Sequence, residues 1–193
     1  MAQALDDLLD SLEDPDDATR EEAAKALAQL ANPTTLDALI GACGDEYWSV
    51  RTRAGWGVAK IGGPKAMEAL IGLFNDPIME VRNEAVAAVV SLGAGQLDRL
   101  LAAMKDERWR VREHAAKACG DLRDARAVDA LVFACRDRDG AVKSAAAEAL
   151  GKIGDAKAIA PLIKLFRDSS KIVRETAGIA LVAIGQPSVD LLL

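Results

Sequence analysis

The segment 106–122, DERWRVREHAAKACGDL, gathers side chains that could carry out chemistry. It contains the only histidine of the chain, His114, between Glu113 and Lys117, with Trp109 and Cys119 nearby. Imidazole, carboxylate and thiol groups that lie close together can bind a metal ion or carry out nucleophilic catalysis. Whether it forms a site depends on whether this segment is unique or one copy of a repeat.

The segment belongs to a pattern that occurs six times. In each copy an aspartate is followed six residues later by a basic residue, and the copies are 31, 31, 30, 31 and 31 residues apart. The pairs are Asp14/Arg20, Asp45/Arg51, Asp76/Arg82, Asp106/Arg112, Asp137/Lys143 and Asp168/Arg174. A fixed period of this length is the signature of a repeat architecture. We therefore expect one solenoid domain, 1–193, with repeats at about 1–31, 32–62, 63–93, 94–123, 124–154 and 155–185, and a partial seventh at 186–193.

The sequence of each repeat predicts two helices. We expect the second helix to begin at the aspartate, which would act as its N-cap, with Pro15 and Pro77 at the first helical position. The first helices are shorter, for example LDALIGAC and VDALVFAC, and proline stands where three of them would begin, at Pro33, Pro64 and Pro187. Glycines that follow the second helices indicate their C-caps. They are Gly62, Gly93, Gly154 and Gly185.

The repeat changes the meaning of the apparent site. Positions are counted from the basic residue of each pair, so that +2 is two residues after it. Cys119 stands at +7, where the other copies have Leu or Val, and so is expected in the core. His114 stands at +2, where the other copies vary, and so is expected on the surface. One histidine cannot supply the three or four ligands of a usual zinc site. We expect no catalytic residues, no metal, no cofactor and no enzymatic activity.

Composition excludes other classes of function. Residues 1–22 contain nine acids and one base, whereas the rest has 21 acids and 23 bases. The chain lacks the basic face that nucleic-acid binding requires. No run approaches the length of a membrane span, and the acidic start does not resemble a signal peptide. Three cysteines without metal-ligand spacing fit reduced thiols. We expect a cytoplasmic protein that binds neither nucleic acid nor membrane.

The side of the second helices that varies between copies is the expected binding surface. At position −3 it carries Trp48, Met79 and Trp109, which should form a row because stacked repeats bring equal positions side by side. The alternative for Trp48 and Trp109 is that their rings pack on the neighbouring loop of the chain itself. Trp56, at +5, is expected near the centre of the exposed side, and Gly55 and Gly57 beside it could permit close approach of the neighbouring helices or of a ligand. Aromatic residues with a polar surround are typical of binding hot spots. The predicted partner-binding residues are Trp48, Arg53, Trp56, Lys60, Met79, Asn83, Trp109, Glu113, His114 and Lys117.

The pattern D-x-x-x-V-R-x-x-A-A-x-A-L-G-x-I-G resembles HEAT repeats of the short variety that is shared with phycobilin lyase subunits. Copy five, DRDGAVKSAAAEALGKIGDAKAIAPLIKLF (137–166), carries it most fully, and the resemblance covers about residues 2–193. It implies an all-α fold, an α-α superhelix (HEAT-like solenoid) of six helix pairs plus a partial seventh. It also implies a convex face of first helices, a concave face of second helices, and a ladder of the Asp and Arg residues between stacked repeats. Lys143 departs from this ladder and should weaken one rung.

Three hypotheses about function follow. The first is a non-enzymatic scaffold that binds another protein on its concave face, centred on repeats two to four. The second is a phycobilin lyase-like subunit or chaperone handling a tetrapyrrole, with Arg53 and Lys60 near its propionates. The third is an engineered repeat binder. End-to-end self-association through the C-terminal repeat is a further expectation.

Overall fold

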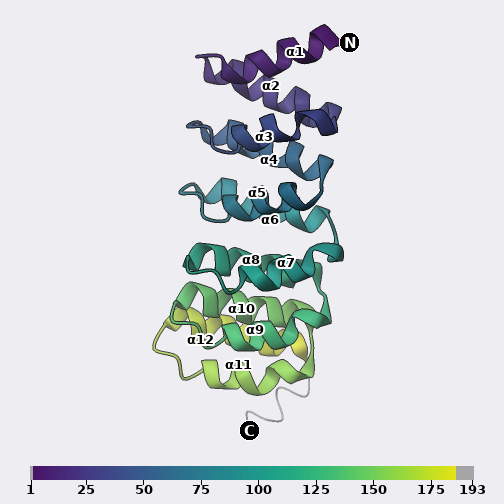
Figure 1. The fold of residues 1–193 in the computed structure, drawn as a ribbon. Coiled ribbons are helices and arrows are strands. Elements are labelled where there is room, and N and C mark those ends of the chain that lie inside the picture. The colour runs from purple at the N-terminus through teal and green to yellow at the C-terminus, as the bar shows by residue number, and fades with distance from the viewer. Residues whose placement is uncertain (1, 186–193) are drawn as a thin grey trace. The chain divides into compact units, whose positions relative to one another are not determined.

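The computed structural model describes residues 2–185, which form helices joined by short turns (Figure 1). These residues contain six helix pairs and no strand, so the predicted all-α architecture is confirmed. The partial seventh repeat, 186–193, with Pro187, lies outside the described residues. The helices are α1 (Ala2–Asp10), α2 (Asp17–Leu30), α3 (Leu36–Ala42), α4 (Trp48–Ile61), α5 (Pro64–Leu73), α6 (Met79–Ser91), α7 (Leu97–Ala103), α8 (Trp109–Leu122), α9 (Val128–Ala134), α10 (Gly140–Ile153), α11 (Ile159–Leu165) and α12 (Lys171–Ile184).

Short 3-10 turns lead into or out of several helices: η1 (Ser11–Glu13), η2 (Pro33–Thr35), η3 (Ala94–Gln96), η4 (Ala125–Ala127) and η5 (Ala156–Ala158). Between residues 2 and 185 no single helix is both long and apolar enough to cross a membrane. Only α6 together with Ala94–Ala103, taken across a bend, reaches that length and composition.

The chain divides into two compact units, Met1–Leu92 and Gly93–Leu193. In the first unit α4 packs between α2 and α6, and α1, α3 and α5 form the second row of helices (Figure 1). In the second unit α10 packs between α8 and α12, and α7, α9 and α11 form the other row. Each helix pair is therefore one layer of its unit.

The core of each unit lies between its two rows of helices. On α4 the residues Val50, Ala54 and Val58 recur at helical spacing and are fully buried. One leucine from the middle of each of five first helices meets such a stripe and is also fully buried. These are Leu39, Leu70, Leu100, Leu131 and Leu162. A single 31-residue module could not cover its own apolar face, so burial requires a neighbouring module.

Glycines allow neighbouring second helices to approach closely. A Cβ atom built on Gly57 would lie 3.0 Å from the Cβ of Ala28, and one on Gly120 would lie 2.7 Å from the Cβ of Ala149. Gly151 has the same relation to Ala180. Real Cβ atoms do not pack at such distances, so these backbones are in contact because the side chain is absent. The interpretation of Gly57 as a helix-packing residue is confirmed.

The repeated aspartates close a turn and do not cap the second helix, so that prediction was wrong. The carboxylate of Asp45 accepts a hydrogen bond from the amide of Tyr47 at 2.7 Å, and Tyr47 is the N-cap of α4. Pro15 and Pro77 consequently lie in this turn, before the helix. The same bond, from the aspartate to the amide two residues on, forms in all six copies: Asp14–Asp16, Asp45–Tyr47, Asp76–Ile78, Asp106–Arg108, Asp137–Asp139 and Asp168–Ser170.

Other terminal signals agree with the structure more closely. Gly62, Gly154 and Gly185 are C-caps as predicted, whereas Gly93 follows Leu92, which is the C-cap of α6. Pro64 is at the start of α5, as expected of a residue without an amide hydrogen. Pro33 is the first residue of the short 3-10 helix η2, which directly precedes α3.

The arginines form a ladder whose geometry differs from the simple pairing in the sequence. Nη1 of Arg51 donates to the main-chain oxygens of Asp45 and Glu46, at 2.8 and 3.0 Å, within its own repeat. Its Nε and Nη2 donate to the carboxylate of Asp76 in the next repeat, at 2.7 and 2.9 Å. The ionic partner is therefore 25 residues later, not six residues earlier. Arg20–Asp45 and Arg112–Asp137 repeat this bidentate arrangement.

Lys143 changes the geometry of one rung, and the expected weakening of that rung stays a prediction. Its ammonium donates to the Asp168 carboxylate but cannot bind in the forked manner of a guanidinium. This hydrogen bond lowers the pKa of Asp168. Burial is the largest single influence on the pKa of Asp45 and Asp137 and raises it, but the hydrogen bonds from Arg20 or Arg112, those from main-chain amides and the nearby positive charges together outweigh it, so both values lie below the ordinary one. These carboxylates are ionised at neutral pH, and the stability they contribute is lost as the pH falls through the lowered pKa.

The most buried rung gives a direct test of the ladder. Asp76→Ala would leave the Arg51 guanidinium almost buried without its carboxylate, and should lower the free energy of unfolding by about 3 kcal/mol. The exposed pair of Lys65 and Asp37 joins the same two repeats, so Asp37→Ala should cost less than about 1 kcal/mol. Urea denaturation followed by circular dichroism measures both. Equal losses would contradict a special role for the ladder.

Candidate functional site

His114 is buried, and its prediction as a surface residue was wrong. Only 1% of it is exposed, and its Nδ1 lies 2.8 Å from the main-chain oxygen of Arg110, to which it donates. Where the preceding repeat lies in the same unit, other residues at +2 also point sideways, toward that repeat. Arg53 binds Glu21 of the preceding repeat, and Thr176 contacts Ser144. The +2 position is thus the flank of the second helix and not its open side.

The thiols of the chain are poor nucleophiles. Burial raises the pKa of Cys43, Cys119 and Cys135 to about 12 in each case, so the reactive thiolate is almost absent at neutral pH. Cys119 is fully buried beside Met104, which confirms its prediction as a core residue. Within residues 2–185 no three His, Cys, Asp or Glu side chains are grouped so that they could hold a metal ion.

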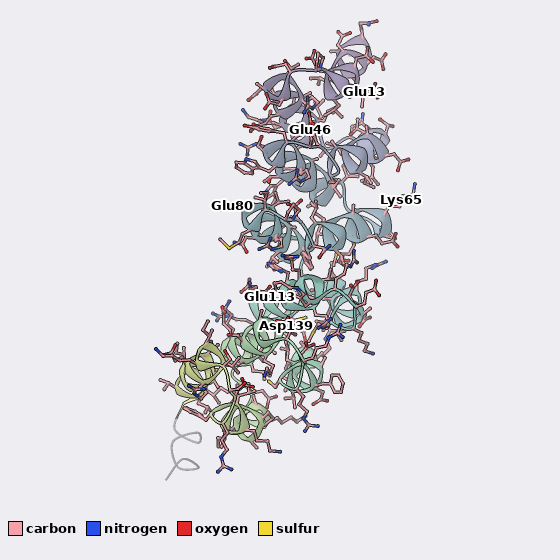
Figure 2. The ribbon with its side chains drawn as sticks, turned by 90° about the vertical axis from the view of Figure 1, so that its left-hand side faces the viewer. Glu13, Glu46, Lys65, Glu80, Glu113 and Asp139 are labelled. Atoms are coloured by element: carbon pink, nitrogen blue, oxygen red, sulfur yellow. The ribbon has the colours of Figure 1, made fainter. Side chains whose placement is uncertain are left out.

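Four large apolar side chains are exposed where α4 and α6 begin. Trp48 is 43% exposed and Met79 is 56% exposed, each as the first residue of its helix. Tyr47 and Ile78, the two N-cap residues, are also exposed. We call these four residues the helix-start patch. Glu80 follows Met79 on α6, and Figure 2 shows it on the side of the unit opposite Lys65 of α5.

Sequence reasoning found half of the helix-start patch. It missed Tyr47 and Ile78 because the second helix was expected to begin at the aspartate, which would have placed both residues inside the first turn. The available signal was the pair of adjacent large residues in two successive repeats, Tyr47–Trp48 and Ile78–Met79.

Trp56 is only partly accessible, so its expected place at the centre of an open face needs correction. Its side chain is half-buried, and its indole Nε1 donates to the Glu84 carboxylate at 2.9 Å. Position +5 of this repeat therefore faces position +2 of the next repeat, on the flank of its second helix. The same kind of link joins Glu21 to Ser49 and Arg53, at 2.6 and 3.2 Å. The polar surround in the first unit is an interlocked network, whereas Lys60 and Asn83 are freely exposed.

The second unit has a recess on its second helices. Its volume is about 420 Å³, and its walls include Glu113 and Lys117, which form an ion pair at 2.6 Å. The recess exists because small residues line it, among them Gly140 and Ser144. Gly140 stands at −3, the position of Trp48 and Trp109. Trp109 itself is exposed, with the Arg110 guanidinium 4.7 Å from its ring centroid.

The predicted binding residues thus fall into two groups. Trp48 and Met79 are exposed at equivalent positions of adjacent repeats in the first unit, as predicted. Arg53 and Trp56 are also in this unit but are engaged with other side chains. The row that would add Trp109 involves both units and stays a prediction. The residues of the second unit are Trp109, Glu113, His114 and Lys117.

The partial burial of Trp56 has a measurable consequence. Trp56→Ala would remove the ring and leave Glu84 without its donor, and should lower the free energy of unfolding by about 2 kcal/mol. Trp48→Ala should change it by less than about 1 kcal/mol, because that ring is exposed. Thermal melts of both variants are compared. A Trp56→Ala protein as stable as the wild type would show that the ring is a free surface residue.

Comparison with known proteins places the chain in a family. Three solved structures share its fold: an engineered protein (TM-score 0.51, 22% identity, 94% of this chain and 96% of that chain), a computationally designed armadillo repeat protein for modular peptide recognition (TM-score 0.50, 22% identity, 94% and 100%), and the complex of CpcE and CpcF of phycocyanin lyase from Nostoc sp. PCC7120 (TM-score 0.60, 20% identity, 77% and 99%). At these identities the likeness shows the fold alone. A comparison with curated proteins found no match. The family model of HEAT repeats matches residues 5–91, 80–141 and 97–182, which together are most of the chain, and the protein therefore belongs to the HEAT-repeat family.

Proposed function

We propose that the protein is a non-enzymatic scaffold that binds another protein through the exposed side of its second helices. The helix-start patch carries this proposal. Tyr47, Trp48, Ile78 and Met79 expose apolar surface that the repeat does not need for its own packing, since Asp17 and Lys171 stand at the position of Trp48 in other copies. Tyr, Trp and Met are enriched in the buried centres of protein interfaces, and Trp and Tyr among hot-spot residues.

The surroundings of the patch support a rigid binding surface. Ser49 is adjacent to Trp48 and is tied to Glu21, which also binds Arg53. The Ser49 hydrogen bond is the main reason that the pKa of Glu21 is lowered, so the carboxylate is charged and held in place. A surface whose side chains are already ordered loses little conformational entropy when a partner binds. The recess beside Glu113 and Lys117 offers a second contact region in the other unit.

Relatives in fold illustrate this mode of action. One is described as a design for modular peptide recognition, and another is a complex of two lyase subunits. Both descriptions name an association with another polypeptide. This supports a binding role for the present chain without identifying its partner.

The proposal is tested by removing the patch without disturbing the core. The Trp48→Ala/Met79→Ala variant should lose about 2 kcal/mol or more of binding free energy, because both side chains would be anchors of the interface. Proteins captured by the wild type but not by this variant identify the partner, and calorimetry with the purified partner measures the loss.

Leu30→Ala is the matched control for this test, because Leu30 is 57% exposed in the same unit but lies at the end of α2. It should bind as the wild type does. A patch variant that keeps the full affinity for every captured partner would refute the proposed surface.

Handling of a tetrapyrrole is the second candidate, because the fold resembles that of the phycocyanin lyase complex. One observation weighs against the original form of this hypothesis: the Arg53 guanidinium, which was expected to bind a propionate, is paired with Glu21. If the protein binds an open-chain tetrapyrrole, adding phycocyanobilin should produce a red-shifted absorbance that Lys60→Ala reduces. An unchanged pigment spectrum at saturating protein would exclude this role.

A further inference from the structure

Phe133 is the most unusual apolar residue of the first helices. It is 76% exposed on α9, whereas the equivalent positions of the other first helices carry Gly41, Gly72, Ala102 and Lys164. The repeat folds with a glycine, an alanine or a lysine at this position, so its own packing does not require a phenylalanine. An exposed large apolar side chain with no structural role indicates an interaction surface.

Phe133 forms one wall of a groove between α7 and α9. The groove has a volume of about 680 Å³, within the range of ligand-binding pockets. Leu101 and Met104 line it from α7 and the residue that follows it, and Ala130 and Ala134 line it from α9. These side chains are apolar and two of them are small, which leaves the space open. The groove lies entirely in the second unit and on the first helices, away from the recess of α8 and α10.

One end of the groove is positively charged. Its two aspartates are neutralised locally, because Asp106 is bound by Arg108 and Asp137 is bound by Arg112. The cations at this end of the groove, in contrast, are not neutralised by an ion pair. Lys105, Arg136 and Arg138 are exposed, and all three line the groove without an ion pair to a carboxylate in residues 2–185. The Arg138 guanidinium donates a hydrogen bond to the main-chain oxygen of Glu107.

Three such cations face one unpaired acid, the Glu107 carboxylate, so the end of the groove retains a net positive charge.

The equivalent groove of the first unit shows that this charge is not a property of the repeat. That groove, of about 480 Å³, lies between α1 with its following turn and α3, and Leu9 and Leu12 line it. Its charged residues are acidic: Asp10, Glu13 and Asp45. The two grooves are built by equivalent helices of different repeats but carry opposite charges. Of the two, only the groove of the second unit combines cations with an exposed aromatic ring.

We propose that the α7–α9 groove binds an acidic peptide segment of another protein, with large apolar side chains against Phe133 and carboxylates beside Lys105, Arg136 and Arg138. Apolar anchors would supply affinity, and the cations would select acidic sequences and speed the encounter. This surface is independent of the helix-start patch, since the two lie in different units and on different rows of helices.

The experiment uses the full chain and three labelled peptides, with binding followed by fluorescence anisotropy. The first peptide combines leucine pairs with glutamates, the second has lysines in place of the glutamates, and the third has alanines in place of the leucines. Only the first should bind, more weakly as salt is raised. Phe133→Gly, which installs the residue found at Gly41 and Gly72, and Arg136→Glu should each weaken binding about tenfold or more.

Val182→Ala is the matched control, because Val182 is 77% exposed on α12 and does not line the groove. Its affinity for the acidic peptide should equal that of the wild type, and circular dichroism should show the same helical content in all variants. The Trp48→Ala/Met79→Ala variant should also bind this peptide normally, which separates the result from the fate of the proposed scaffold function.

Several results would overturn the proposal. Equal binding of the acidic and basic peptides would remove the charge selection, and an affinity unchanged by Phe133→Gly would place any binding elsewhere. Failure of the acidic peptide to bind would exclude this class of partner. If sedimentation shows that the wild type dimerises and that Phe133→Gly abolishes the dimer, a second copy of the chain occupies the groove instead.

Discussion

The stacking of repeats depends on one interaction, in which a single arginine guanidinium binds its own repeat and the next repeat at the same time. Arg51 holds the carbonyl oxygens of its own turn with one nitrogen and the carboxylate of Asp76 with the other two. Asp76 at the same time closes the turn before α6 by accepting from the Ile78 amide. The internal geometry of one repeat and its attachment to the next therefore use the same few atoms. This coupling makes stability a sum of nearest-neighbour contacts, as expected for repeat proteins.

The repeated pattern of the sequence predicted the fold well, because positions that are apolar in nearly every copy are the buried positions. Leu27 and Cys119, which both stand at position +7, could be placed in the core from their column alone. Local hydrogen bonding was less predictable. An aspartate before a helix can cap it or can close the preceding turn, and both roles have similar sequence patterns. The ionic partner of each arginine was ambiguous for a similar reason. Because the repeats have a nearly constant length, an arginine inside the array has one aspartate at a fixed distance before it and another at a nearly fixed distance after it, and the sequence does not show which of the two it binds.

The site was harder to predict than the fold, because a helical wheel separates only the inner side of a helix from the outer side. In a stack of helices the two flanks are also covered, each by a neighbouring repeat. Trp56 lies on such a flank and His114 is buried, but the wheel assigned both to the open side. Trp48 and Met79 were placed correctly since they stand at helix starts, beyond the reach of the flanking helices. Phe133 was overlooked because only the second helices were sorted by column.

The glycine contacts between second helices have a consequence for how such a chain can evolve. Gly57 meets Ala28, whereas at two later junctions the order is reversed, and Gly120 meets Ala149 and Gly151 meets Ala180. Position +8 of one second helix thus meets position +6 of the next, and one of the two residues is glycine at each of these junctions. Placing the module of Ala28 directly before the module of Ala149 would bring alanine against alanine at the new junction, whereas duplicating the module of Ala149 and Gly151 in place would keep glycine against alanine. Rearranging the order of modules therefore demands a compensating substitution at some new junctions, whereas lengthening the array by duplication of such a module does not.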